Sequence, residues 1–128
     1  MILLEEQFKK LGLAKYQSLA LSMLVLNKSC TAERIAESCG IPITKVYAVL
    51  DSLKNLGFVK SDLQRPKNFY AEDIEVIINL LIKKHRENLL VIEKQSREIL
   101  YNFKEFMNTS TNFDEFHGFE KALKPQQP

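Results

Sequence analysis

The sequence has little glycine or cysteine and no tryptophan. Its 128 residues include four Gly, four Pro, two Cys and no Trp. Glycines that stand singly exclude a glycine-rich nucleotide-binding loop, and a low glycine content is typical of a mostly helical protein. No CxxC or His-rich spacing is present, so we expect no metal site. Without a Ser/His/Asp set or paired carboxylates in a plausible pocket, we expect neither a catalytic residue nor a cofactor.

The cysteines and the hydropathy indicate an intracellular protein. Cys30 and Cys39 flank a short predicted helix within the core, which favours two free thiols over a disulfide. The acidic N-terminus is too short for a signal peptide, and no stretch reaches the apolar length of a membrane span. We therefore predict a cytoplasmic protein with no membrane partner.

Charge is nearly balanced overall but unevenly distributed. The formal net charge is only +2. Residues 41–70 carry five basic and two acidic side chains, a local balance of +3, whereas residues 71–107 carry six basic and seven acidic ones, a balance of −1. Because phosphate groups are neutralised locally, one basic face on a mixed surface is what DNA binding requires.

Hydrophobic periodicity predicts four short helices, over residues 3–11, 14–27, 32–39 and 44–56. Thr31 is a suitable N-cap for the third helix, and Gly40 is a suitable residue to end it. Apolar residues recur at helical spacing along the fourth helix and define its inward face. This face consists of Val46, Val49, Leu50, Leu53 and Leu56.

A β-hairpin is predicted directly after the fourth helix. Residues 58–61 and 68–71 are its strands, and Arg65 lies in the loop between them. Helix, tight turn, helix and hairpin form the order of a winged helix-turn-helix. We therefore predict a mainly α protein, of the α+β winged-helix class, with its DNA-binding domain over residues 1–72.

A long helix is predicted over residues 73–107, with Asp73 as its capping residue. Along one face of this helix, which we call the seam, residues follow one another at alternate spacings of four and three, which is a heptad repeat over four heptads. The seam consists of Ile78, Ile82, His85, Leu89, Ile92, Ser96, Ile99, Phe103 and Phe106. About 34 helical residues span ~50 Å, more than a 70-residue domain can cover. The seam therefore predicts a homodimer, with parallel and antiparallel pairing both open and the bulk of the two phenylalanines favouring the antiparallel one.

Residues 108–128 lose this pattern. The segment is polar and contains proline, so we expect it to be loosely ordered apart from an aromatic patch at Phe113, Phe116 and Phe119. His117, which lies within it, is expected to be exposed.

The outer face of the fourth helix is the candidate DNA-binding surface, since its N-terminal half would enter the major groove. Lys45 and Tyr47 can reach phosphates or base edges, and Ala48 can pack on a thymine methyl group. The predicted DNA-binding residues are Thr44, Lys45, Tyr47, Ala48, Ser52, Arg65 and Lys67.

Simpler interpretations stand beside these. Tyr47 is equally compatible with packing against the second helix. Arg65 and Lys67 are also compatible with solubilising charges on a hairpin edge. His85 is best explained as a packed histidine of the seam, and Arg34 as a residue that covers its own helix.

Four runs also resemble a known family. Residues 10–20, 32–50, 56–59 and 65–70, including the sequence IPITKVY, resemble the TrmB-type archaeal transcriptional regulators in order. The resemblance implies a winged helix, DNA binding in transcription and a dimerising C-terminal helix. Larger members carry a C-terminal sugar-binding domain, for which this chain has no room, so sugar sensing is not expected.

We therefore expect a dimeric DNA-binding transcriptional regulator, with the recognition helix 44–56 in the major groove and the wing 58–71 on the backbone of double-stranded DNA. Two alternatives stay open. One is an architectural, chromatin-like protein with little sequence preference, and the other is a winged-helix module that binds proteins. The sequence identifies no effector.

Overall fold

The computed structural model describes residues 2–109, apart from the side chain of Ile2. By their contacts these residues form two compact units, one ending at Lys84 and one beginning at His85. The elements in chain order are α1 (Ile2–Lys10), α2 (Lys15–Leu26), β1 (Cys30–Thr31), α3 (Ala32–Cys39), α4 (Ile43–Asn55), β2 (Val59–Ser61), β3 (Asn68–Ala71) and α5 (Ile74–Thr109). The predicted aromatic patch at 113–119 lies outside the described residues.

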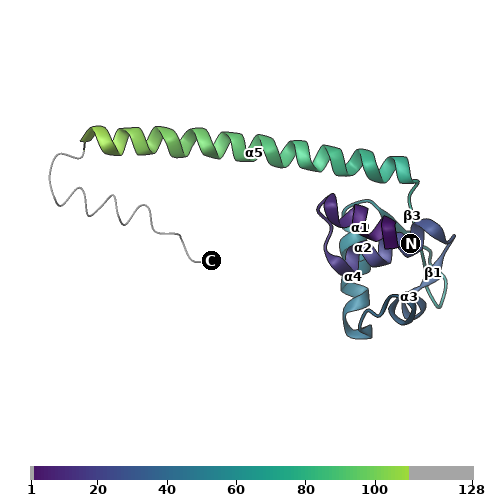
Figure 1. Ribbon diagram of the computed structural model, residues 1–128. Coiled ribbons are helices and arrows are strands. Elements are labelled where there is room, and N and C mark those ends of the chain that lie inside the picture. The colour runs from purple at the N-terminus through teal and green to yellow at the C-terminus, as the bar shows by residue number, and fades with distance from the viewer. Residues whose placement is uncertain (1, 110–128) are drawn as a thin grey trace. The chain divides into compact units, whose positions relative to one another are not determined.

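The first unit is a winged helix, so the predicted fold class is confirmed. Helix α1 packs on α2, and α2 in turn contacts α3, α4 and β3 (Figure 1). The three strands form an antiparallel sheet in the order β1-β3-β2, with Cys30 opposite Phe69 and Lys60 opposite Tyr70. The β2–β3 hairpin is the wing, and α3 and α4 form the helix-turn-helix.

Helix α2 lies at the centre of the core. Ala20 and Leu21 on this helix are fully buried, and so are the hydroxyls of Ser18 and Ser22. Because Ser22 donates a hydrogen bond to the carbonyl of Ser18 at 2.6 Å, its burial leaves no unpaired donor. Helix α2 can therefore be covered by neighbouring elements on several sides without leaving the Ser22 hydroxyl unpaired. This agrees with the wide apolar surface of its sequence.

Both ends of α3 are set by residues within or next to the helix. The Thr31 hydroxyl accepts the backbone N–H of Arg34 at 3.3 Å, and this N-cap was predicted. Gly40 ends α3 with φ of 67°, in the left-handed region that favours glycine. The N–H of the buried Ile41 then donates to the carbonyl of Ala36 at 3.0 Å. The Gly40 conformation and the Ile41 bond thus form the start of the tight connection to α4.

The observed elements differ from the predicted ones at several ends. The recognition helix is Ile43–Asn55 rather than 44–56, and α5 continues to Thr109 rather than to 107. Strand β1 was not predicted. Its two residues form a strand only because they pair with β3, whose sequence lies about 40 residues further along the chain.

The two cysteines are free, as predicted. Cys30 is buried and Cys39 is half-buried. Burial raises the pKa of the Cys39 thiol, which favours its protonated form.

Helix α5 belongs to both units. Ile77 and Leu81, near the start of the helix, are buried in the core of the first unit, which ends at Lys84. From His85 to Thr109, no residue of the described helix is buried. The apolar side chains of this stretch are largely open to solvent, including Leu89, Ile92 and Ile99.

Candidate nucleic-acid interface

Helix α4 is anchored on one side and open on the other. Val46, Leu50 and Leu53 have no exposed surface and hold the helix against the core. Thr44, Lys45, Tyr47 and Ala48, all predicted to contact DNA, lie on the exposed side, whereas Ser52 is half-buried. The structure therefore presents the first two turns of α4 as an outward-facing surface.

The start of α4 is not capped by a side chain. Pro42 occupies the N-cap position, and no side chain caps the helix. The N–H groups of Lys45 and Val46 donate to the Pro42 carbonyl at 2.8 and 3.1 Å. No acidic residue lies in the first turn, so the positive end of the helix dipole is not neutralised from within.

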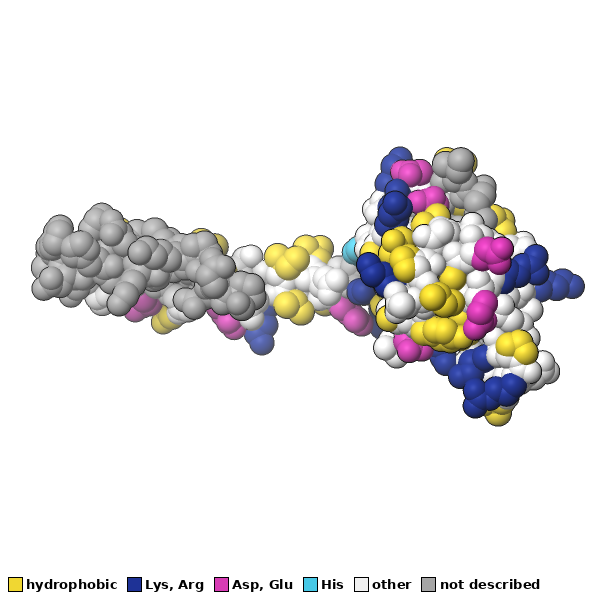
Figure 2. Space-filling model, turned by 90° about the horizontal axis from the view of Figure 1, so that it is seen from below, with side chains coloured by type: hydrophobic (Ala, Val, Ile, Leu, Met, Phe, Trp, Pro, Cys, Tyr) yellow, Lys and Arg dark blue, Asp and Glu magenta, His cyan; other side chains and the backbone are white. Residues whose placement is uncertain are grey.

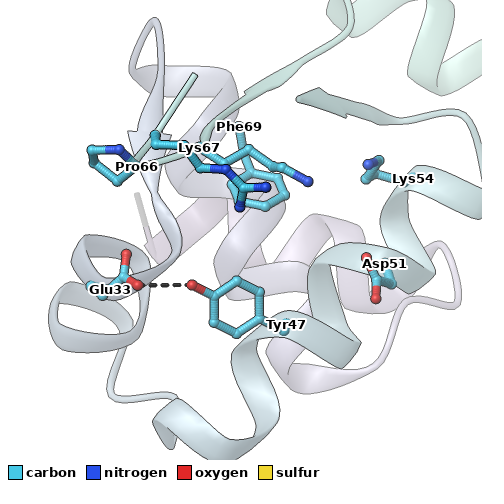
Figure 3. A pocket seen from close by; sticks show the side chains of 8 residues that line it. Glu33, Tyr47, Asp51, Lys54, Pro66, Lys67 and Phe69 are labelled. Atoms are coloured by element: carbon cyan, nitrogen blue, oxygen red, sulfur yellow. Dashed lines mark hydrogen bonds between the residues drawn. The ribbon is translucent and has the colours of Figure 1, made fainter. Parts of the chain in front are cut away.

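A hydrogen bond links α4 to α3. The Tyr47 hydroxyl donates to Oε1 of Glu33 at 2.8 Å, as the dashed line in Figure 3 shows. This bond lowers the pKa of the Glu33 carboxyl and raises the pKa of the Tyr47 hydroxyl. Tyr47 does not pack beneath the surface, because almost half of its surface is exposed. The tyrosine ring is thus held in one orientation on the outside of the helix-turn-helix.

The other flank of α4 contacts the start of α2. The Lys45 ammonium lies 5.9 Å from the centre of the Tyr16 ring, within range of a cation–π interaction. Gln17 donates from Nε2 to the Ser52 hydroxyl at 3.1 Å, and that hydroxyl donates to the Val49 carbonyl at 2.6 Å. The predicted DNA-binding residue Ser52 therefore already uses its hydroxyl within the protein.

A cleft separates α4 from the wing. Its volume is about 250 Å³, and Figure 3 shows side chains of α3, α4 and the wing around it. The lining residues are Glu33, Tyr47, Asp51, Lys54, Arg65, Pro66, Lys67 and Phe69. The structure thus brings Tyr47, Arg65 and Lys67 together, although the wing residues lie about 20 positions further along the chain.

The basic side chains around the cleft differ in their engagement. Lys54 donates to the Ser61 hydroxyl at 2.9 Å. Lys60, which does not line the cleft, pairs with Glu72 at 2.6 Å, and this pairing raises the pKa of Lys60. Within residues 2–109, neither Arg65 nor Lys67 forms an ion pair, and both are exposed. These two cations are therefore the ones available to an external phosphate.

Sequence reasoning missed part of this surface. It did not assign Glu33, Asp51 or Lys54 to the site. The helical spacing from Tyr47 to Asp51 and Lys54 is a signal that could have found the last two. No sequence signal joins Glu33 to Tyr47, because that contact depends on the angle between α3 and α4.

Figure 2 shows the first unit from the side on which α3 and α4 lie. Hydrophobic side chains occupy the middle of this face, and lysine and arginine side chains gather around them with acidic ones interspersed. Ile43 and Tyr47 of α4 are among the large hydrophobic residues whose side chains are exposed to solvent. Such a face can contact both the bases and the phosphates of a duplex.

The described residues offer no metal site. Residues 2–109 contain no group of three or more His, Cys, Asp or Glu side chains placed to hold a metal ion. In the same part of the chain, no helix combines the length and apolar character that crossing a membrane requires.

Comparison with protein families gives a match over more than half of the chain. Residues 8–75 match the family described as "Sugar-specific transcriptional regulator TrmB". The chain is also 33% identical over 125 residues to the HTH-type sugar sensing transcriptional regulator TrmBL1 of Pyrococcus furiosus. The match covers 95% of this chain but 35% of the relative, so the chain spans about a third of that protein's length.

A second relative is the uncharacterized protein MJ1623 of Methanocaldococcus jannaschii. It is 26% identical over 76 residues, which cover 59% of this chain and 15% of that protein. Both relatives are therefore much longer than the region they share with this chain.

Two solved structures share the fold. TrmBL2, described as an archaeal chromatin protein, superimposes with a TM-score of 0.74 at 19% identity, over 85% of this chain and 42% of that one. A possible transcriptional regulator from Methanosarcina mazei gives a TM-score of 0.56 at 11% identity, over 69% of this chain and 80% of that one. At these identities the likeness concerns the fold alone.

Proposed function

The chain belongs to the TrmB family of transcriptional regulators, and from this premise we propose that it binds double-stranded DNA to regulate transcription and does so as a homodimer. The observation that carries the proposal is the exposed outer face of α4 beside the exposed Arg65 and Lys67 of the wing. We assign it a binding role and no reaction.

In this proposal the first two turns of α4 enter the major groove. Thr44 and Ala48 face the bases, because both are exposed on the side opposite the buried Val46 and Leu50. A threonine hydroxyl can bond to base edges and an alanine methyl can pack on a thymine methyl. These two residues would therefore carry sequence preference.

The cations on both flanks would hold phosphates. Lys45 lies on the α2 side of the recognition helix, and Arg65 and Lys67 lie on the wing side. Phosphate contacts on two sides fix the register of a helix in the groove without reading sequence. Tyr47 would add a contact from its exposed ring, while Ser52 would support the surface through Gln17.

A matched pair of double variants tests the phosphate contacts. Lys45→Ala with Arg65→Ala should weaken binding to every duplex and make the salt dependence shallower by about two units of log–log slope, since each lost phosphate contact removes ~0.9. Lys94→Ala with Arg97→Ala removes the same two side-chain types from the second unit and should leave DNA binding near that of the parent.

Fluorescence anisotropy with a labelled duplex, measured over a series of salt concentrations, gives both quantities. Equal binding by the Lys45/Arg65 variant and the parent would place the interface on another face. If the parent bound no mixed-sequence duplex at low salt, the DNA-binding proposal would be wrong. A module that binds proteins would then be the remaining alternative.

Competition separates regulation from an architectural role. A sequence-specific regulator binds its own site ~10³–10⁷ times more tightly than random duplex, whereas an architectural protein shows little difference. Selection from a randomised duplex library, followed by competition with unselected DNA, measures this ratio. A ratio near one would favour the chromatin-like alternative.

The dimer is proposed to form through the seam of α5. Seven of the nine seam positions are apolar: Ile78, Ile82, Leu89, Ile92, Ile99, Phe103 and Phe106. Burial of each such side chain contributes ~1.5–3 kcal/mol, and association costs ~4–15 kcal/mol. A helix with this much open apolar surface is stabilised by a partner. The division into a DNA-binding domain (1–72), a dimerisation helix (73–107) and a tail (108–128) stays a prediction.

Two neighbouring residues provide the test of the dimer. Ile92 and Val91 are both 60% exposed in the single chain, but only Ile92 lies on the seam. Ile92→Glu should convert the dimer to a monomer, whereas Val91→Glu should leave it intact. Sedimentation equilibrium measures both masses. A monomeric parent at micromolar concentration, or two variants that behave alike, would contradict the seam.

A further inference from the structure

The tip of the wing carries the most exposed large hydrophobic side chain of the described residues. Leu63 is 97% exposed, and Leu3, the next most exposed, is 71% exposed. A single exposed leucine is ordinary on a protein surface. Leu63 differs because it lies at the tip of a hairpin, in a loop whose base is held together by hydrogen bonds.

The base of the loop is closed by Asp62. Its Oδ1 accepts the backbone N–H groups of Gln64 at 3.1 Å and Asn68 at 3.0 Å, and its own N–H donates to the Asn68 carbonyl at 3.0 Å. These N–H donors lower the pKa of the Asp62 carboxyl, which is therefore ionised at neutral pH. The carboxylate is committed to the backbone, and Leu63 is left at the apex.

The surroundings of Leu63 are basic. Arg65 and Lys67 follow it in the same loop, are exposed, and form no ion pair within residues 2–109. Phe69, buried in β3, anchors the returning strand. The tip therefore presents one apolar side chain with two exposed cations beside it, of which Lys67 also acts electrostatically on Asp62. This combination suits a polyanion that also has an apolar interior.

Duplex DNA offers such an interior between its stacked base pairs. Major and minor grooves alternate along a duplex, so a wing that lies beside α4 can reach the minor groove next to a major groove that α4 occupies. Apolar side chains such as leucine can enter between base steps from that groove and partly unstack them. Arginine is attracted to the same groove where it is narrow, at A·T-rich sequences.

We propose that Leu63 is an apolar wedge that enters the minor groove of bound DNA, with Arg65 beside it, and that it unstacks a flexible pyrimidine–purine step. The proposal rests on the proposed function, because it requires the helix in the adjacent major groove. It assigns the wing tip a part in reading DNA deformability, in addition to the phosphate contacts of the wing.

The test uses the full chain and duplexes that contain 2-aminopurine, whose fluorescence rises when the base is unstacked. The selected binding site is synthesised as a set in which the fluorescent base moves by one position at a time. The parent should raise the fluorescence at one step beside the site of the recognition helix. Leu63→Ala should abolish that rise and weaken binding by about fivefold to tenfold, since it removes the wedge and the contacts it permits.

Three further variants make the result specific. Leu63→Met keeps an apolar wedge and should retain the rise in fluorescence. Leu63→Lys adds a phosphate contact in place of a wedge and should bind without the rise. Leu3→Ala makes the same change at the next most exposed leucine, on α1, and should behave as the parent does.

The outcomes separate the two proposals. If the parent binds no duplex, the proposed function fails together with the wedge. If the parent binds without a rise at any position, or if Leu63→Ala keeps both the rise and the affinity, the wedge is wrong while DNA binding stands.

Discussion

The two stretches of α5 share one helix but differ completely in packing. Up to Lys84, Ile77 and Leu81 are buried in the core of the first unit. From His85 to Thr109, no described residue is buried, although leucine, isoleucine and phenylalanine recur along the stretch. Apolar periodicity therefore predicts that a helical face will be covered, but it does not say which molecule covers it.

The register of α5 explains how one helix serves two roles. The buried pair Ile77 and Leu81 precedes the predicted seam residues Ile78 and Ile82 by one position each. One residue corresponds to about 100° around an α-helix. The chain's own core thus occupies a face adjacent to the seam, and Ile82 remains 45% exposed. Further along the helix, the seam residues Leu89, Ile92 and Ile99 are exposed in the single chain, whereas Ile78 is half-buried.

The largest expected effect lies in the buried stretch. Ile77→Ala removes a fully buried side chain and should lower the free energy of unfolding by about 2–5 kcal/mol. Val76, its neighbour, is 40% exposed, and Val76→Ala should cost much less. Urea denaturation followed by tyrosine fluorescence measures both changes. Equal losses would mean that burial does not distinguish these positions of α5.

A smaller effect is expected in the open stretch, and it should depend on protein concentration. Ile99 lies on the seam and Tyr101 lies off it, although both are 65% exposed in the single chain. In a dimer, Ile99→Ala should lower the unfolding free energy by about 1.5–3 kcal/mol per chain, because that side chain becomes buried. Tyr101→Ala should have little effect. Melting curves at several concentrations measure the difference, and concentration-independent curves for the parent would contradict it.

Local features of the fold could be predicted from the sequence. The Thr31 cap, the Gly40 helix end and the buried Val46, Leu50 and Leu53 depend on residues within one helix or its ends. Helical spacing and backbone preferences act over a few residues, so a single sequence contains the required information.

Contacts across elements could not be predicted. Strand β1 exists only through its pairing with β3, and Glu33 meets Tyr47 only because of the angle between α3 and α4. Ser52 was assigned to DNA from its helical position, yet its hydroxyl is engaged by Gln17 from α2. The outer arc of a helix can be read from its sequence, but the neighbours that occupy that arc depend on the tertiary fold.

A third prediction tests one of the local features in the first unit. Thr31→Ala removes the side-chain oxygen that accepts the Arg34 N–H and should lower the free energy of unfolding by about 1 kcal/mol. Thr31→Ser keeps an oxygen at the cap and should recover most of the loss. Urea denaturation of the two variants measures it. A loss of equal size in both would assign the effect to the threonine methyl group rather than to the cap.

The smallest expected effect concerns the exposed hydrogen bond between Tyr47 and Glu33. Because both groups are exposed, Tyr47→Phe should change the unfolding free energy near neutral pH only slightly, although it lies in the well-packed unit. The lowered pKa of Glu33 makes its contribution present above the carboxyl's unfolded pKa and lost as pH falls through the folded one.

The raised pKa of Tyr47 acts in the opposite direction. Its contribution is present below the hydroxyl's unfolded pKa and lost as pH rises through the folded one. The difference in stability between the parent and Tyr47→Phe should therefore be largest between the two titrations and vanish at both extremes. Denaturation across the pH range measures this difference. If the difference in stability between the parent and Tyr47→Phe did not change with pH, the hydroxyl would act by positioning the ring and not through its bond to the Glu33 carboxylate.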